Sequence, residues 1–485
     1  MHFSIPETEE LGDTRSKSYT GYCLHINGVY HCMVRYRQLH NLHEQLRREF
    51  NPLPAFPPKK LFNLNEKEVE DRRLMLEKYM QLISQDHRIS NSQTFNTFLL
   101  TAQKETRREE IENINLEVFL MNEHKITVSV LTIEQTDVVL DNVCDQLHVP
   151  EDLVSCFSLF LIRRDGDGDI TVVRKLQDFE SPFISQKALS TSSSINSSDN
   201  SLGPIKIMLR KSCWDATIDD VLLSEQSTLN LLYIQTVADI ERGWVVTSSD
   251  TKQQLALMQA RGSKRQFMEV ARTLKFYGYM VFRPCVSDHP EPHTQVTVAI
   301  GRGCLSMRTV TTEGETREYS FKITRMRCWR IMKGDHEQSE NGHQQVGMLK
   351  SEGSKLELSF EYLVTPEKLE WVRVVSSQAI LMSMCLQSMV EELVRIRSGE
   401  KEPQRITRCS NKQRQSVGSR PHHSNADQSP EAEEGCGGPV DYTVRRLAEK
   451  FSVVNMKTAS RAAEDVFVEN EMFNTSGVSE DGDED

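Results

Sequence analysis

The stretch "PAFPPKKLFNLNEKEVEDRRLMLEKYM", residues 54–80, joins a proline-rich turn to a helix that carries two adjacent arginines. The prolines favour an extended, polyproline-like path. Asn65 is an acceptable helix N-cap, and Glu68 three residues later completes a capping box. The stretch therefore predicts a stiff loop that presents Lys59 and Lys60 beside the first turns of a helix.

Further cations lie near this loop in the predicted fold. Arg35 ends a preceding hairpin, and Arg72 lies about two turns into the helix. Arginine offers a rigid fork of donors that suits phosphate oxygens, and lysine offers a movable point charge. From the residues alone, two interpretations remain open: an anion site and a solvated basic face.

Three apolar residues follow the two lysines: Leu61, Phe62 and Leu64. They suit a wedge that dips into the acyl boundary of a membrane, and ordinary packing inside the domain is the alternative. No apolar run in the chain approaches the roughly 20 residues that span a bilayer. We therefore expect any membrane contact to be peripheral.

The composition excludes several classes of protein. The chain has 485 residues and a formal net charge of −12, which disfavours nucleic-acid binding and confines any basic site to a local patch. Its 11 cysteines are scattered without CxxC pairs, which favours reduced thiols in the cytosol. The N-terminus lacks the basic and apolar regions of a signal peptide. No nucleophile has a base at a recognisable spacing, so we do not expect an enzyme.

Residues 1–107 are predicted to form a compact, separate α+β domain. A β-hairpin is expected over Tyr19–Tyr36, because Asn27-Gly28 suits a type I′ turn between two β-prone arms. Apolar stripes at helical spacing predict three helices, and the residues on them are Leu39, Leu42, Leu46 and Phe50, then Val69, Leu76 and Met80, then Phe95, Phe98, Leu99 and Ala102.

The rest of the chain divides into four predicted parts. Residues 113–211 show the order hairpin, helix, hairpin of a ubiquitin-like fold, and the insert "STSSSINSSDNS" is expected to be a floppy loop. Residues 212–277 are mostly helical. Residues 278–397 are short alternating strands closed by a long helix. Residues 398–485 are polar and are expected to be disordered, with an acidic end.

Other short motifs do not fit a metal or cofactor site. "DGDGD", residues 165–169, lacks the glycine and the bidentate glutamate of a calcium loop, and a hairpin turn fits it better. "GRGCLS", from Gly301, lacks the third glycine and the following helix of a dinucleotide site. No His/Cys cluster has zinc spacing. We expect no metal and no cofactor.

"RMRCWRIM", residues 325–332, is typical of a strand. Four of its residues are expected to share one face: Arg325, Arg327, Trp329 and Ile331. Trp329 is either a core residue or the wall of a pocket on an exposed edge strand that accepts a peptide by β-augmentation. The neighbouring groove wall would be the closing helix, whose apolar residues at helical spacing are Leu386, Val390 and Val394.

The linked motifs "VRYRQLHNLHEQLRREF", "LPAFPPKKLF" and "EDRRLMLEKYMQ" resemble a phox-homology (PX) domain. The ubiquitin-like, helical and β-sandwich series after it resembles the three lobes of a FERM domain, of which the third is PTB-like. This α+β multidomain arrangement is similar to the group of sorting nexins 17, 27 and 31. "FYGYM", "ITRMRCWRIM" and "SSQAILMSMCLQSMVEEL" are most similar to the branch of sorting nexins 17 and 31.

The resemblance implies roles for the basic residues. In PX domains, the residues that match Arg35, Lys59 and Arg72 bind the headgroup of phosphatidylinositol 3-phosphate, and Lys60 lies beside them. The family usually has a small hydroxyl or aromatic residue at the position of Arg37. A long cation there either adds a phosphate contact or crowds the site.

The resemblance also implies a cargo site and a cellular role. In this family, the third FERM lobe binds NPxY or NPxF sorting signals through residues that match Trp329 and Val390, and we expect Arg327 and Val394 beside them. The implied protein is an adaptor in the cytoplasm and on the cytoplasmic face of early endosomes. It would return transmembrane cargo to the cell surface and keep it from lysosomal degradation.

Further partners and alternatives follow from the same resemblance. A FERM-type linker between membrane and cytoskeleton is one alternative, although the tail shows no basic actin-binding helix. An effector of small GTPases, acting through the ubiquitin-like lobe, is another.

The end "VENEMFNTSGVSEDGDED" resembles the acidic tail with which the family engages an endosomal retrieval complex. That tail normally ends in leucine, whereas this one ends at Asp485, so Phe473 and Val478 would carry the apolar contact.

Overall fold

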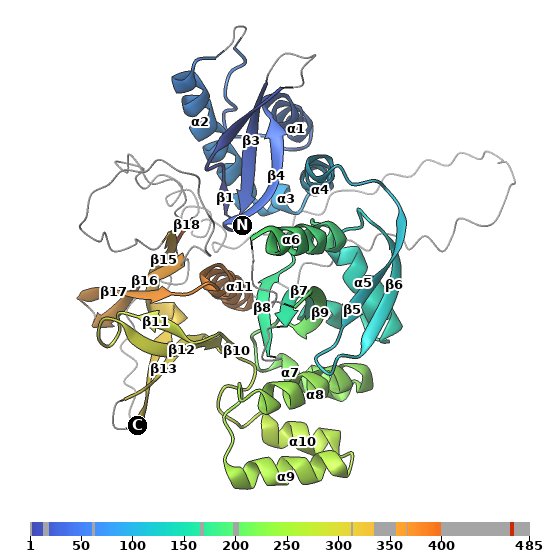
Figure 1. The fold of residues 1–485 in the computed structure, drawn as a ribbon, viewed down its shortest axis with the longest axis vertical. Coiled ribbons are helices and arrows are strands. Elements are labelled where there is room, and N and C mark those ends of the chain that lie inside the picture. The colour runs from blue at the N-terminus through green and yellow to red at the C-terminus, as the bar shows by residue number, and fades with distance from the viewer. Residues whose placement is uncertain are drawn as a thin grey trace, which may run out of the picture. The chain divides into compact units, whose positions relative to one another are not determined.

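The structure, a computed structural model, describes residues 2–12, 19–60, 64–164, 169–196, 203–311, 314–333, 356–365, 367–398 and 466–469. All of these residues belong to one compact unit. Helices and strands follow one another in the predicted order: a mixed N-terminal part, a ubiquitin-like lobe, a helical lobe and a strand-rich lobe (Figure 1). No helix within these ranges is long and apolar enough to cross a membrane.

The N-terminal part is an antiparallel sheet covered by helices. Its strands are β1 (Phe3–Ser4), β2 (Thr8–Leu11), β3 (Tyr19–Ile26) and β4 (Val29–Arg35). Its helices are α1 (Tyr36–Glu49), α2 (Glu66–Gln85), α3 (His87–Ser90) and α4 (Gln93–Arg107). Asn27 and Gly28 both have positive φ and form the predicted turn. Asn65 caps α2 and makes the predicted reciprocal hydrogen bonds with Glu68.

The core of this part contains the predicted stripe residues except Val69, which is only half-buried, and one residue from far along the chain. Leu39, Leu76 and Leu99 are fully buried, and Phe179 packs into the same cluster. The Phe179 ring lies edge-on to the ring of His31, with 5.5 Å between centroids. The core of the N-terminal part is therefore completed by a residue of the next lobe.

The ubiquitin-like lobe has a five-stranded sheet in the order β6-β5-β9-β7-β8, in which β5 and β9 run parallel. Its strands are β5 (Asn113–Phe119), β6 (Lys125–Leu131), β7 (Phe157–Arg164), β8 (Ile170–Lys175) and β9 (Ile205–Lys211). Its helices are α5 (Thr136–Gln146), the 3-10 turn η1 (Glu151–Cys156) and α6 (Pro182–Asn196). The prediction of a floppy insert is wrong up to Asn196, because α6 continues through "STSSSIN".

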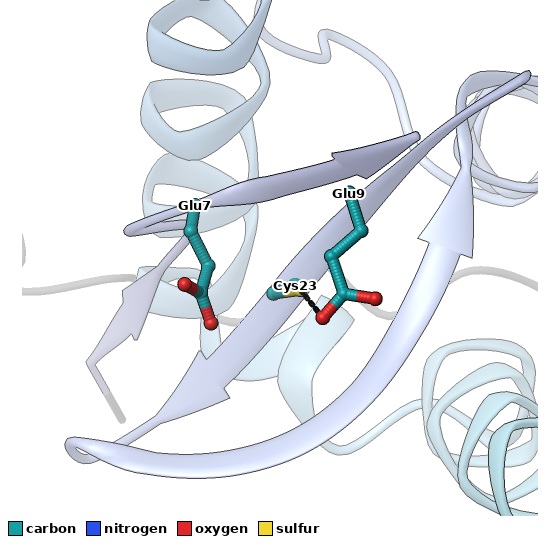
Figure 2. A group of neighbouring side chains, drawn as sticks. All are labelled: Glu7, Glu9 and Cys23. Carbon is teal, nitrogen blue, oxygen red and sulfur yellow. Dashed lines mark hydrogen bonds between the residues drawn. The ribbon is translucent and has the colours of Figure 1, made fainter. Parts of the chain in front are cut away.

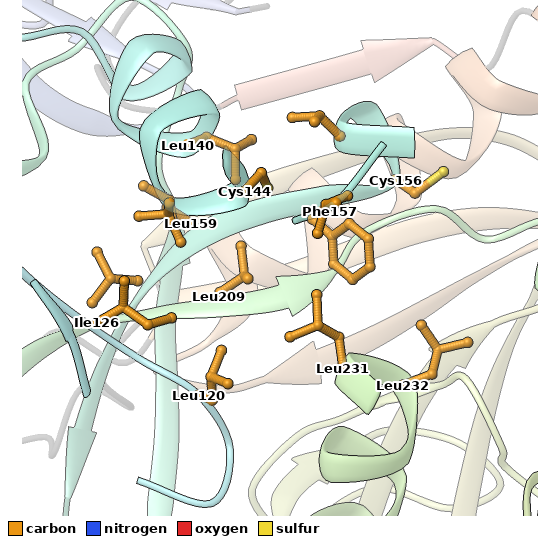
Figure 3. Close-up of a cluster of buried hydrophobic side chains, with 14 of the residues drawn as sticks. Leu120, Ile126, Leu140, Cys144, Cys156, Phe157, Leu159, Leu209, Leu231 and Leu232 are labelled. Atoms are coloured by element: carbon orange, nitrogen blue, oxygen red, sulfur yellow. The ribbon is translucent and has the colours of Figure 1, made fainter. Parts of the chain in front are cut away.

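The helical lobe consists of α7 (Ile218–Ser224), α8 (Gln226–Glu241), α9 (Ser249–Ala260) and α10 (Lys264–Ala271). It shares one apolar core with the ubiquitin-like lobe. Leu231 and Leu232 of α8 pack in the same cluster as Phe157 and Leu209 (Figure 3). The two lobes are thus held together by buried apolar surface, which is the dominant favourable term in packing.

The third lobe is a strand-rich layer closed by a long helix. Its strands are β10 (Met280–Val281), β11 (Cys285–Ser287), β12 (Thr294–Gly301), β13 (Cys304–Val310), β14 (Thr316–Lys322), β15 (Met326–Lys333), β16 (Leu356–Thr365) and β17 (Lys368–Val375). A 3-10 turn, η2 (Ile323–Arg325), precedes β15, and α11 (Ala379–Ser398) packs against β15 and β16.

A ninth strand comes from the tail. β18 (Val466–Glu469) pairs antiparallel with β15, at the end of the sheet order β14-β13-β12-β11-β17-β16-β15-β18 (Figure 1). The prediction of disorder is therefore wrong for these four residues. The acidic end lies outside the described residues.

Candidate lipid-binding and peptide-binding sites

Tyr36 connects the three elements of the predicted lipid site. It is the first residue of α1, directly after Arg35. Its hydroxyl donates a hydrogen bond of 2.8 Å to the carbonyl of Pro57, in the proline-rich loop. The guanidinium of Arg72 stacks on its ring, 4.4 Å from the centroid. The hairpin end, the loop and α2 therefore meet around one aromatic ring.

The two arginines of the predicted site are held by aromatic rings and not by carboxylates. Arg35 has an exposed side chain, and its guanidinium stacks on Tyr19 at 3.3 Å from the ring centroid. Arg72 is only 9% exposed, and its Nη2 has no hydrogen-bond partner among the described residues. Burial raises the pKa of Tyr22, and the charge of Arg72 opposes that rise. A buried guanidinium nitrogen without an acceptor is what an anion would satisfy.

The remaining predicted lipid residues fall into two groups. Arg37 and Lys59 are exposed. Lys60 forms an ion pair of 2.7 Å with Glu68, and this contact lowers the pKa of the Glu68 carboxyl. Part of the charge of Lys60 is therefore already neutralised. Of the predicted wedge, Leu64 is half-buried, and Leu61 and Phe62 lie outside the described residues.

Arg73, the second arginine of the quoted stretch, turns away from this site. It pairs with Glu70 at 2.6 Å and donates to the carbonyl of Ile5. The hydrogen bond to Ile5 links α2 to the segment between β1 and β2, so Arg73 has a structural role.

A cluster that the sequence did not predict lies on the same sheet. Glu7, Glu9 and Cys23 bring their side-chain ends within 4.8 Å of one another (Figure 2). Burial, together with both carboxylates, raises the pKa of the Cys23 thiol to about 11. The thiol stays protonated near neutral pH, so it is a poor metal ligand. The two glutamates are exposed, and the described residues offer no further donor to this group.

In the predicted peptide site, Trp329 joins β15 to α11. Its side chain is 1% exposed, and its Nε1 donates a hydrogen bond of 3.0 Å to Ser383 Oγ. Val390 lies two turns beyond Ser383 on α11 and is buried, and Val394 follows half-buried one turn later. The structure therefore brings Trp329 to the same helix that carries the two valines.

Arg327 does not share the face of Trp329. A β-bulge interrupts the pairing of β15 with β16 between Met326 and Cys328, and Arg325 belongs to η2. Arg327 is exposed and pairs with Glu361, whereas Trp329 and Ile331 are buried. The predicted common face of Arg325, Arg327, Trp329 and Ile331 is therefore wrong for both arginines.

The outer edge of β15 pairs with the chain's own tail. Trp329 lies opposite Val468, and Ile331 lies opposite Val466. The sequence continues from Glu469 with "NEMF", residues 470–473, which has the asparagine and the aromatic residue of NPxF at the same spacing. This strand was missed at the sequence level, although its Val-Phe-Val run is β-prone.

The fold and these two sites define a PX–FERM protein. Residues 23–102 match the PX domain family. Residues 114–214 match the F1 lobe of the sorting nexin 17/27/31 FERM domain, and residues 215–275 match the F2 lobe of sorting nexins 17 and 31. Residues 278–394 match the sorting nexin 17 FERM C-terminal domain.

Whole-chain relatives agree with these matches. Sorting nexin-17 of Bos taurus is 48% identical over 402 residues, which cover 82% of this chain and 83% of the relative. Sorting nexin-17 of Homo sapiens is 47% identical over 408 residues, with 82% and 83% covered. Sorting nexin-31 of Homo sapiens is 33% identical over 393 residues, with 81% and 86% covered.

The chain therefore belongs to the sorting nexin 17 family of endosomal sorting adaptors. The predicted resemblance and fold class are confirmed. This is a family of adaptors and not a known family of enzymes. Its PX domain implies phosphoinositide binding, and its FERM domain implies binding of cargo tails.

Proposed function

We propose that this protein binds phosphatidylinositol 3-phosphate on early endosomes and captures cargo tails that carry NPxY or NPxF signals. The result would be recycling of cargo to the cell surface and avoidance of lysosomal degradation. The lipid would bind at Arg35, Lys59 and Arg72. The cargo signal would lie along β15, between Trp329 and the Val390 stripe of α11.

One observation carries the cargo proposal. An extended segment of the chain itself, β18, already pairs with the edge of β15. Edge strands accept extended peptides through backbone hydrogen bonds, and side-chain pockets then supply the specificity. The segment that follows β18 has the spacing of an NPxF signal. A cargo tail of this type would need the same edge, so it would compete with β18.

The lipid proposal is supported by the unpartnered nitrogen of Arg72 and by the ring of Tyr36, which joins hairpin, loop and helix. An arginine fork and a lysine point charge are the donors that recognise a phosphate monoester. Each charge-assisted contact contributes about 1.5–3 kcal/mol.

The cargo proposal is best tested at Val394. Replacing Trp329 by alanine would cost about 3–5 kcal/mol of folding free energy, because the ring is fully buried and hydrogen-bonded. Val394 is half-buried on the same stripe, so Val394→Asp places a charge at the groove with less damage to the core. We expect affinity for an NPxY peptide, measured by calorimetry, to fall roughly tenfold or more.

The matched control is Val364→Asp. Val364 is exposed on β16, so the same change of residue should leave the affinity for the peptide unaltered. If both aspartate variants bind the peptide as the wild type does, cargo does not use the α11 groove.

A further inference from the structure

A cavity of about 40 Å³ lies where the three FERM lobes meet. β7, β8 and β9 of the ubiquitin-like lobe line one side, and Gln235 of α8 adds the helical lobe. The segment Gly278–Met280 and one face of α11 complete the lining from the third lobe. Since a single water needs about 10–15 Å³, the cavity has room for roughly three waters or for one small polyatomic ion.

The charged side chains that line this cavity are all cations: Lys175, Arg210 and Lys211. Lys211 is paired with Asp219. Lys175 is half-buried, and no ion pair involves it among the described residues. Among the described residues, no carboxylate lines the cavity. The lining therefore carries an excess of positive charge.

Arg210 is the central cation, and its partners satisfy it only in part. Its side chain is 2% exposed, and its Nε has no hydrogen-bond partner among the described residues. Its two terminal nitrogens lie 3.3–3.4 Å from the carboxylate of Asp239, and one lies 3.0 Å from the sulfur of Met121. Charge-assisted hydrogen bonds are normally 2.7–2.9 Å long, so this ion pair is loose.

The guanidinium of Arg242 also interacts electrostatically with the carboxylate of Asp239. Asp239 feels the charges of both Arg210 and Arg242, and burial nevertheless raises the pKa of its carboxyl. Arg242 also has a buried nitrogen, Nη1, without a partner in the described part of the chain. One carboxylate therefore faces two arginines, and a buried unpaired donor costs about 1–3 kcal/mol.

We propose that this cavity binds a small anion of phosphate size between Arg210 and Lys175. The arginine supplies a fixed positive charge, and the lysine supplies a charge that can swing toward the ion. A tetrahedral phosphate offers the several acceptor oxygens that these donors lack. The ion is either free phosphate or the phosphate group of a small monoester.

The test is calorimetry of the full chain with inorganic phosphate and, separately, with glycerol 3-phosphate, at constant ionic strength. All proteins carry Arg35→Ala, so that the separate lipid site contributes little. We expect Lys175→Met to weaken phosphate binding roughly tenfold or more, because one charge-assisted contact is lost. Lys175→Arg, which keeps the charge, should retain binding and shows that the position tolerates substitution.

The matched control is Lys252→Met, which removes the same charge from an exposed position on α9. It should leave phosphate binding unchanged. Binding of inorganic phosphate alone would identify the free ion, and equal binding of glycerol 3-phosphate would identify a monoester. If the parent protein binds neither probe, or if both methionine variants bind equally well, the cavity holds only water and the proposal is wrong.

Discussion

At the scale of single residues, the geometry of the proposed lipid site depends on a bulge in the first hairpin. The turn Asn27-Gly28 alone would place Thr20 opposite Arg35. A register shift between Leu24 and His25 places Gly21 opposite Arg35 instead, and Tyr19 becomes its diagonal neighbour on the same face. The cations could be predicted from the sequence, because their type and spacing are local. The stacking of Arg35 on Tyr19 could not, because one bulged residue decides it.

Replacing Arg35 tests the lipid site directly. Arg35→Ala should remove most binding to liposomes that contain phosphatidylinositol 3-phosphate, and should leave the fold intact because the side chain is exposed. A basic residue near an anionic surface contributes only about 1 kcal/mol without specificity, so a larger loss indicates a phosphate contact. Liposome flotation measures this.

The matched control is Arg48→Ala, on α1, the helix that follows Arg35, and also exposed. It should reduce flotation only slightly. Equal losses in the two variants would show that the loop is a general basic face and not a headgroup site.

At the scale of elements, local signals predicted most of the fold. The turn glycine of the first hairpin, the capping box of α2 and the apolar stripe of α11 each determine their element from neighbouring residues. Elements that depend on distant partners were missed. α6 extends through serines because it packs against β9, and β18 forms because the edge of β15 is free to pair with it.

The bulge before Cys328 explains why the prediction that Arg327 shares a strand face with Trp329 is wrong. Strict alternation predicts that residues two apart share a face, and one extra residue reverses that assignment. The buried position of Trp329 was one of the two interpretations open at the sequence level. Its role in cargo binding stays a prediction, as do the roles of Val390 and Val394.

At the scale of the whole molecule, the PX domain and the ubiquitin-like lobe are joined through buried contacts. His31 Nε2 donates a hydrogen bond of 3.1 Å to the carbonyl of Leu99, and the His31 ring contacts Phe179 of the next lobe. Gln103 of α4 bonds both Ser181 and Ser185 at 2.9 Å. These long-range contacts could not be predicted from the sequence, because no local pattern marks them.

The buried His31 predicts a pH dependence. Burial lowers its pKa from 6.5 to about 4. The unfolded chain therefore binds a proton that the folded chain excludes, and the stability contribution is lost as the pH falls from 6.5 toward 4. At pH 5 this loss amounts to about 2 kcal/mol. Glu180 opposes the shift, and Arg174 and Arg107 add to it.

Denaturant unfolding of the wild type and of His31→Gln, at pH 7.5 and pH 5, measures this effect. Glutamine keeps a donor near Leu99 but does not titrate, so the variant should lose about 2 kcal/mol less than the wild type between the two pH values. Identical losses would show that His31 is not the group that senses pH in this interface.

We propose that cargo binds at the edge of β15, the edge with which β18 of the chain's own tail pairs. Calorimetry of the full chain with an NPxY peptide tests this most directly, in the wild type, in Val468→Pro and in the matched control Val454→Pro. Proline removes a backbone donor and disfavours the strand, so Val468→Pro should free the edge. We expect Val468→Pro to bind the peptide roughly tenfold more tightly than the wild type, and Val454→Pro to bind it as the wild type does. Equal affinity of all three proteins would contradict the proposal.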